Sequence, residues 1–119
     1  MEDLLIEILE TFGYPVKRQG SLGNDPYPDR FFTFWCRDSY DGTYYDNNPI
    51  SIIEIFDVNF YSIEPDETHL MLKKARVKLK EHGFIVDGAG HDVDSDEQTH
   101  TGRGINVMYN NYDYVEQED

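Results

Sequence analysis

The stretch GFIVDGAGHDVDSDEQTHTGRGINVMY, residues 83–109, decides the fold because it joins the end of a helix, two apolar strands and an acidic loop. Gly83 follows a helical pattern, and glycine readily takes the left-handed conformation that ends a helix. Residues 84–86 predict a short strand, and residues 87–90 predict a turn because they contain two glycines. Apolar side chains then recur at every second position, as in a strand with one buried face, at Ile105, Val107 and Tyr109. The stretch therefore predicts an antiparallel hairpin with a long acidic connection.

Upstream, residues 52–61 are the strongest strand prediction, because Ile, Val, Phe and Tyr dominate them. Ile52, Phe56, Val58 and Phe60 share one face of this strand. The opposite face begins apolar at Ile53 and Ile55 and becomes polar at Asp57 and Asn59. Such a face is typical of a strand whose apolar end packs under a helix or a neighbouring subunit while its other end meets water.

Two helices are predicted. The first follows Glu2 and Asp3, has apolar residues at helical spacing up to Phe12, and ends at Gly13 and Pro15. The second opens at residues 64–67, where a proline and acidic residues suit a first turn. Its apolar side is expected to consist of Leu72, Ala75, Leu79 and His82. It also holds five of the ten basic residues of the chain: Lys73, Lys74, Arg76, Lys78 and Lys80.

Further strands are predicted at residues 16–18 and 31–37, separated by a polar loop over residues 20–30. The pair Asp41-Gly42 favours a hairpin turn, and residues 47–49 add a second break. We therefore expect an α+β fold, a mostly antiparallel sheet with two packed helices in the order α-β-β-β-α-β-β. Residues 1–112 are expected to form one domain and residues 113–119 a flexible acidic tail.

The formal net charge of −14 opposes binding to the phosphates of nucleic acids. Cys36 is the only cysteine, so no disulfide within the chain is possible, and we interpret it as a small core residue beside Trp35. The acidic start of the chain is unlike a signal peptide, and no apolar run has the ~18 residues of a membrane span. We expect a protein that is soluble when made and does not enter a membrane.

An acidic loop offers the one set of residues with metal-ligating chemistry. The aspartates begin a calcium-loop pattern that fails at Glu97, where glycine is needed, and at Arg103, where a bidentate glutamate is needed. The two histidines lack the spacing of a zinc site. No Ser, His and Asp set has a nucleophile elbow, so we expect neither a metal, nor a cofactor, nor enzymatic activity. The loop residues are His91, Asp92, Asp94, Asp96, Glu97 and His100.

Exposed tyrosines, loop aspartates and one arginine are the candidate interface residues. Tyrosine is favoured at protein interfaces because it combines an apolar ring with a polar tip. Gly102-Arg103-Gly104 is interpreted as a strand entrance whose arginine can grip a carboxylate of a binding partner in two-pronged fashion. The candidates are Tyr40, Tyr44, Tyr45, Asp92, Asp94, Asp96 and Arg103.

In its residues as well as in its pattern of predicted elements, the chain resembles the tail terminator or tail-completion proteins of long-tailed phages and prophages of Gram-positive bacteria. The segments that support the resemblance are TFGYPVKRQGSLGNDPYPDRFFTFW (residues 11–35), YDNNPISIIEIFDVNFYS (residues 45–62) and HTGRGINVMY (residues 100–109). With the intervening helix they cover most of the chain, and none is a catalytic signature.

The resemblance implies an α+β structural protein of the virion neck, assembled in the host cytoplasm. It implies a homo-oligomeric ring, a hexamer in this group, that caps the tail tube protein and meets a head–tail connector or stopper protein. DNA would pass through the lumen of the ring without specific binding. Three alternatives stay open: another neck component such as a stopper or adaptor, an acidic inhibitor that mimics DNA, and a metal-dependent hydrolase built on residues 91–100.

Overall fold

A computed structural model describes residues 2–18, 27–41, 44–45, 48–49, 51–95 and 99–111. It contains two helices and a five-stranded sheet with the strand order β1-β2-β5-β7-β6. A two-stranded ribbon of β3 and β4 lies between β2 and β5 in the chain. The helices are α1 (Glu2–Glu10) and α2 (Pro65–Glu81), and the strands are β1 (Val16–Arg18), β2 (Arg30–Asp41), β3 (Tyr44–Tyr45), β4 (Asn48–Pro49), β5 (Ile52–Ser62), β6 (Ile85–Val93) and β7 (Thr101–Asn111).

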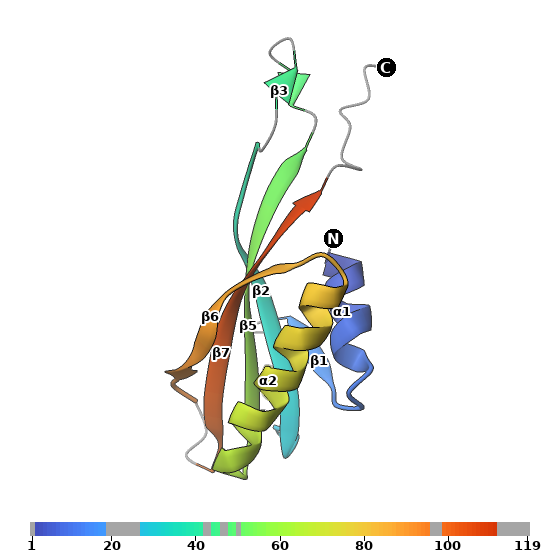
Figure 1. Cartoon of the computed structure of the whole chain (residues 1–119). Coiled ribbons are helices and arrows are strands. Elements are labelled where there is room, and N and C mark those ends of the chain that lie inside the picture. The colour runs from blue at the N-terminus through green and yellow to red at the C-terminus, as the bar shows by residue number, and fades with distance from the viewer. Residues whose placement is uncertain are drawn as a thin grey trace.

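The predicted α+β class is confirmed, and its element order needs one change. The sheet is mostly antiparallel, since β2, β5, β7 and β6 pair antiparallel and only β1 pairs parallel to β2. The predicted order omitted the β3–β4 ribbon, because its residues Tyr44–Tyr45 and Asn48–Pro49 lie among turn-forming residues and are too short to give a strand period. The paired β2 and β5 extend past the helices as an arm, which ends in this ribbon (Figure 1).

Both helices cover the same face of the sheet (Figure 1). α1 contributes Leu5, Ile8 and Leu9 to the core, and α2 contributes a buried stripe of Leu72, Ala75 and Leu79. His82 was predicted to belong to this apolar stripe, but it is exposed. The reason is that α2 ends at Glu81 and the chain turns away at Gly83, whose φ is 90°. The same core contains Phe84, just before β6, and these residues of the sheet: Phe32, Phe34, Phe56, Val58, Phe60, Val86, Ile105 and Val107.

The predicted turn at residues 87–90 is wrong, because β6 continues through it to Val93. The pairing of β6 with β7 shifts register between Asp87 and His91. Gly88 and Gly90 have φ values of 73° and 106°, so the glycines make an irregularity inside a strand rather than a chain reversal. The strand predicted over residues 31–37 is also longer than expected, since β2 runs to Asp41 past a register shift after Cys36.

On the sheet face opposite the helices, the part of the chain that the structure describes covers only one end. There, Phe31 and Tyr61 stack with ring centroids 5.2 Å apart, and both are buried. The rings of Tyr27 and His100 pack edge-on against Phe31, and Nε2 of His100 lies 2.8 Å from the carbonyl oxygen of Pro28. Away from this aromatic cluster, we call the rest of this side the open sheet face.

A clasp of polar side chains holds the start of α2 against the sheet. Arg30 at the start of β2 donates from Nε and Nη2 to the carboxylate of Glu67, the second bond being 2.8 Å. The hydroxyl of Ser62 at the end of β5 donates to the same carboxylate at 3.1 Å and accepts from the backbone N–H of Glu64 at 3.0 Å. The hydrogen bond from Arg30 lowers the pKa of Glu67 below its ordinary value of 4.5.

We expect Glu67→Gln to lower the melting temperature at neutral pH, and the difference from the wild type to shrink below pH 4.5. A carboxylate whose pKa is lowered in the folded state stabilises it above the unfolded pKa, and this is lost as pH falls through the folded pKa. Thermal unfolding of both proteins, followed by circular dichroism over a pH series, measures the difference. A difference that is the same at every pH would rule the clasp out as its cause.

Candidate functional site

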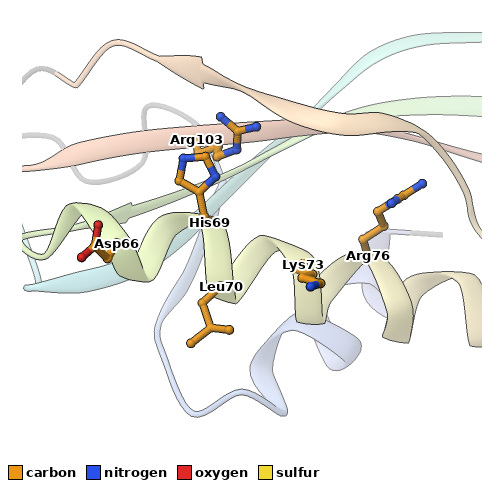
Figure 2. A pocket seen from close by; sticks show the side chains of 6 residues that line it. All are labelled: Asp66, His69, Leu70, Lys73, Arg76 and Arg103. Atoms are coloured by element: carbon orange, nitrogen blue, oxygen red, sulfur yellow. The ribbon is translucent and has the colours of Figure 1, made fainter.

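The outer side of α2 has an apolar ridge that no other described element covers. Leu70 and Val77 are 54% and 55% exposed. They are seven residues apart, so they lie on one side of the helix about 10 Å apart along its axis. This side is opposite the buried stripe of α2. Figure 2 shows Leu70 directed away from the sheet while His69 is directed toward it.

Lysine side chains flank the ridge, and a hollow lies on each side of it. Lys73 and Lys74 are exposed and lie between Leu70 and Val77. One hollow, of about 470 Å³, lies toward the sheet and is lined by Asp66, His69, Leu70, Lys73, Arg76 and Arg103 (Figure 2). The other, of about 570 Å³, lies on the side of Phe12 and Lys78. The ridge therefore combines apolar side chains with a basic centre, although the chain as a whole has a net charge of −14.

The open sheet face has an apolar row with an acidic border. Strand pairing places Ile55, Met108 and Ile85 side by side on β5, β7 and β6, and Ile85 is 59% exposed. Asp38 on β2 is opposite Ile55 and continues the row. These three apolar side chains line a hollow of about 170 Å³ together with Arg37 and Asp87.

A second row next to this one is polar and contains the most exposed aromatic ring of the face. Trp35 is 46% exposed, and its Nε1 donates to Oδ2 of Asp57 at 2.7 Å. The other carboxylate oxygen of Asp57 lies 4.0 Å from Nη1 of Arg37. Pairing continues the row from Asp57 through Asn106 to Asp87. The indole is therefore fixed in place with one side open.

Gly102 and Gly104 lie at the start of β7, as predicted, and they make room for side chains of β5. A Cβ added at Gly102 would lie 2.6 Å from the ring of Tyr61, and one at Gly104 would lie 2.2 Å from Oδ1 of Asn59. The ring of Tyr61 is buried, so Gly102 needs the absence of a side chain, whereas at Gly104 the nearest atom is the end of the Asn59 side chain, which can turn aside. The aromatic cluster at the end of the open sheet face depends on Gly102.

Arg103, between these glycines, faces α2 and already has a carboxylate partner. Its Nη1 donates to Oδ1 of Asp92 at 2.9 Å and its Nη2 donates to the carbonyl oxygen of Gly90 at 3.2 Å. The side chain of Arg103 is 16% exposed, whereas that of Asp92 is 84% exposed. Arg103 thus grips β6 of its own hairpin, at the irregularity made by the glycines.

The remaining predicted interface residues do not gather at one place. Tyr40, which is 44% exposed, is opposite Ile53, whereas Arg103 is opposite Phe60. These positions are seven residues apart on β5, or about 23 Å. Asp94 is exposed just beyond β6. Asp96 and the side chains of Tyr44 and Tyr45 lie outside the described part of the chain.

The metal hypothesis depends on a loop that the structure describes only in part, since residues 96–98 are outside it. Among the residues that are described, no group of three or more His, Cys, Asp or Glu side chains could hold a metal ion. Asp92 pairs with Arg103, and the ring of His100 packs in the aromatic cluster.

Sequence reasoning missed the ridge, and of the open sheet face it predicted only the apolar start of one side of β5. A signal for the ridge was present, since Leu70 and Val77 are apolar positions seven apart in a helix otherwise polar on that side. For the open sheet face, the apolar start of one side of β5, at Ile53 and Ile55, indicated an additional covering layer. The structure has no helix over it among the described residues, and both side chains are partly exposed.

We expect Gly102→Ala to lower the free energy of unfolding by about 1–3 kcal/mol, the usual cost of overpacking, because the new methyl group meets the ring of Tyr61. Asn106→Ala, on the same face of the same strand, is the control and should have a smaller effect because it adds no atoms. Urea denaturation measures both. Equal stability of Gly102→Ala and the wild type would show that Tyr61 does not need this space.

None of the helices in the described part of the chain is long and apolar enough to cross a membrane. A scan against protein-family models finds no match to this chain, and no curated protein is significantly similar to it.

Proposed function

We propose that this chain is a structural protein of a phage tail, a tail terminator that forms a ring on the end of the tail tube and joins it to the head connector. The observation that supports this most is a pair of surfaces, the α2 ridge and the open sheet face, whose exposed apolar side chains no described element covers. An assembling subunit needs exposed apolar side chains that another copy can cover, because burial of apolar surface drives most protein–protein association.

The position of the two surfaces suits a ring. A ring subunit uses one patch to bind a different patch on the next copy, so each copy needs two patches that face different neighbours. The ridge and the open sheet face are on opposite sides of the two-layer domain (Figure 1). Both contacts of a subunit can therefore be made at the same time.

The arm of β2 and β5 offers a further contact, separate from the body of the domain. It extends beyond the helices (Figure 1), and Tyr40 near its end is 44% exposed. In a ring, such an arm would reach a neighbouring component of the tail or the connector. The tyrosines predicted as interface residues, Tyr40, Tyr44 and Tyr45, all belong to this arm.

The net charge of −14 fits a part through which DNA passes without binding, because like charges oppose phosphate contacts. The same acidity suits an inhibitor that mimics DNA. The distribution of charge favours the assembly role, since a mimic needs a continuous acidic surface and α2 interrupts it with basic residues on its outer side. Other neck components, namely stoppers and adaptors, also need an acidic charge and surfaces for assembly, so they are the alternative.

We expect purified wild-type protein to form one closed oligomer as its concentration rises. Mass from light scattering over a concentration series, with electron microscopy of any large species, measures this. The resemblance predicts a ring of six subunits. A protein that remains monomeric at every concentration tested would contradict a ring that forms by itself.

A further inference from the structure

These two surfaces, which no described element covers, are both apolar, and the basic centre of the ridge is complementary in charge to the acidic border of the open sheet face. At the centre of the α2 ridge, Lys73 and Lys74 lie between Leu70 and Val77. On the open sheet face, aspartates border the apolar row, and the nearby cation Arg37 lies 4.0 Å from one of them, Asp57. The aspartates of this face are Asp38, Asp57 and Asp87.

Charge disfavours a contact of the ridge with itself. In an antiparallel pair of α2 helices, the register that sets Leu70 against Val77 of the second copy also sets Lys73 against Lys74. The same register sets Asp66 against Glu81, so like charges meet at both ends as well as in the middle. Juxtaposed like charges oppose binding, so two-fold pairing through this surface is unfavourable.

Charge also disfavours a contact of the open sheet face with itself. Two copies of it packed together would bring Asp38, Asp57 and Asp87 close to their own counterparts. Unlike surfaces in contact would instead place lysines near aspartates and bury apolar side chains from both copies. The possible contacts are ridge with ridge, sheet face with sheet face, and ridge with sheet face. Only the last of these buries apolar side chains of both copies and also brings opposite charges together.

We propose that the α2 ridge of one copy of this chain packs on the open sheet face of the next copy, in a head-to-tail contact. The apolar parts match in length, since Leu70 and Val77 are about 10 Å apart along the helix and the row from Ile55 to Ile85 spans about 10 Å across three strands. Lys73 and Lys74 then reach Asp57 and Asp87.

Trp35 supplies the aromatic anchor of this contact. A tryptophan is among the residues that contribute most to binding when an interface buries them. Its ring is held by the bond to Asp57, so little freedom remains to be lost on binding. The contact therefore has an apolar centre, a fixed aromatic ring and a charged border.

This inference rests on the proposed assembly role and adds the surfaces that meet. The two can fail separately. A head-to-tail contact closes into a ring only if the rotation from copy to copy allows it, and otherwise gives an open filament. A filament held by these surfaces would confirm the contact and contradict the terminator ring.

Two variants, each altered on one surface, test the contact. The ridge variant is Lys73→Glu with Lys74→Glu, and the sheet variant is Ile85→Lys with Asp87→Lys. All four side chains are exposed, and circular dichroism checks that each variant is folded. We expect either variant alone to associate at least roughly 30-fold more weakly than the wild type, the effect of losing an interface hot spot.

Mixing the two variants provides the matched control, because each retains the surface that the other lacks. The intact ridge of the sheet variant can bind the intact sheet face of the ridge variant, and the pair cannot grow further. Light scattering should therefore show two monomeric samples that combine into a one-to-one dimer. If either variant alone assembles like the wild type, or the mixture stays monomeric, the inference is overturned, and in the first case the ring proposal survives.

Discussion

The constraint on which the rest of this structure depends is that both helices pack on one face of the sheet. A single core forms there from phenylalanines of β2 and β5 and the apolar stripes of α1 and α2. A sheet of this size has a second face, and the described residues cover only one end of it, with the cluster around Phe31 and Tyr61. The uncovered remainder and the exposed ridge of α2 are what a second protein can bind.

Local sequence patterns predicted the elements and most of their bounds. The helices, β1, β5 and β7 follow from periodicity and from Gly13 and Gly83, which have φ values of 88° and 90°. The error at residues 87–90 has a physical cause: glycine with positive φ suits a turn and a strand irregularity equally, and only pairing with β7 decides between them. The β3–β4 ribbon is too short to give a period at all.

The candidate site could be predicted less well, because it depends on which face each helix covers. Alternation in β5 separates Phe56 and Val58 from Ile55 and Asp57, but it does not say which set meets the helices or whether both do. Arg103 shows the same limit. Arg103 was predicted to grip a carboxylate of a binding partner with both prongs, whereas in the structure it gives one hydrogen bond to Asp92 and one to the carbonyl oxygen of Gly90. This pairing could not be predicted, since Asp92 comes opposite Arg103 only through the register of β6 and β7.

The central claim is that unlike surfaces of neighbouring copies meet, and chemical cross-linking measures this most directly. In a Cys36→Ser background, the double variant Val77→Cys, Ile85→Cys places one thiol on each surface. We expect a short thiol-specific cross-linker to give a ladder of oligomers from the double variant and no dimer from either single variant. Dimers from Val77→Cys alone, or no ladder from the double variant, would contradict the account.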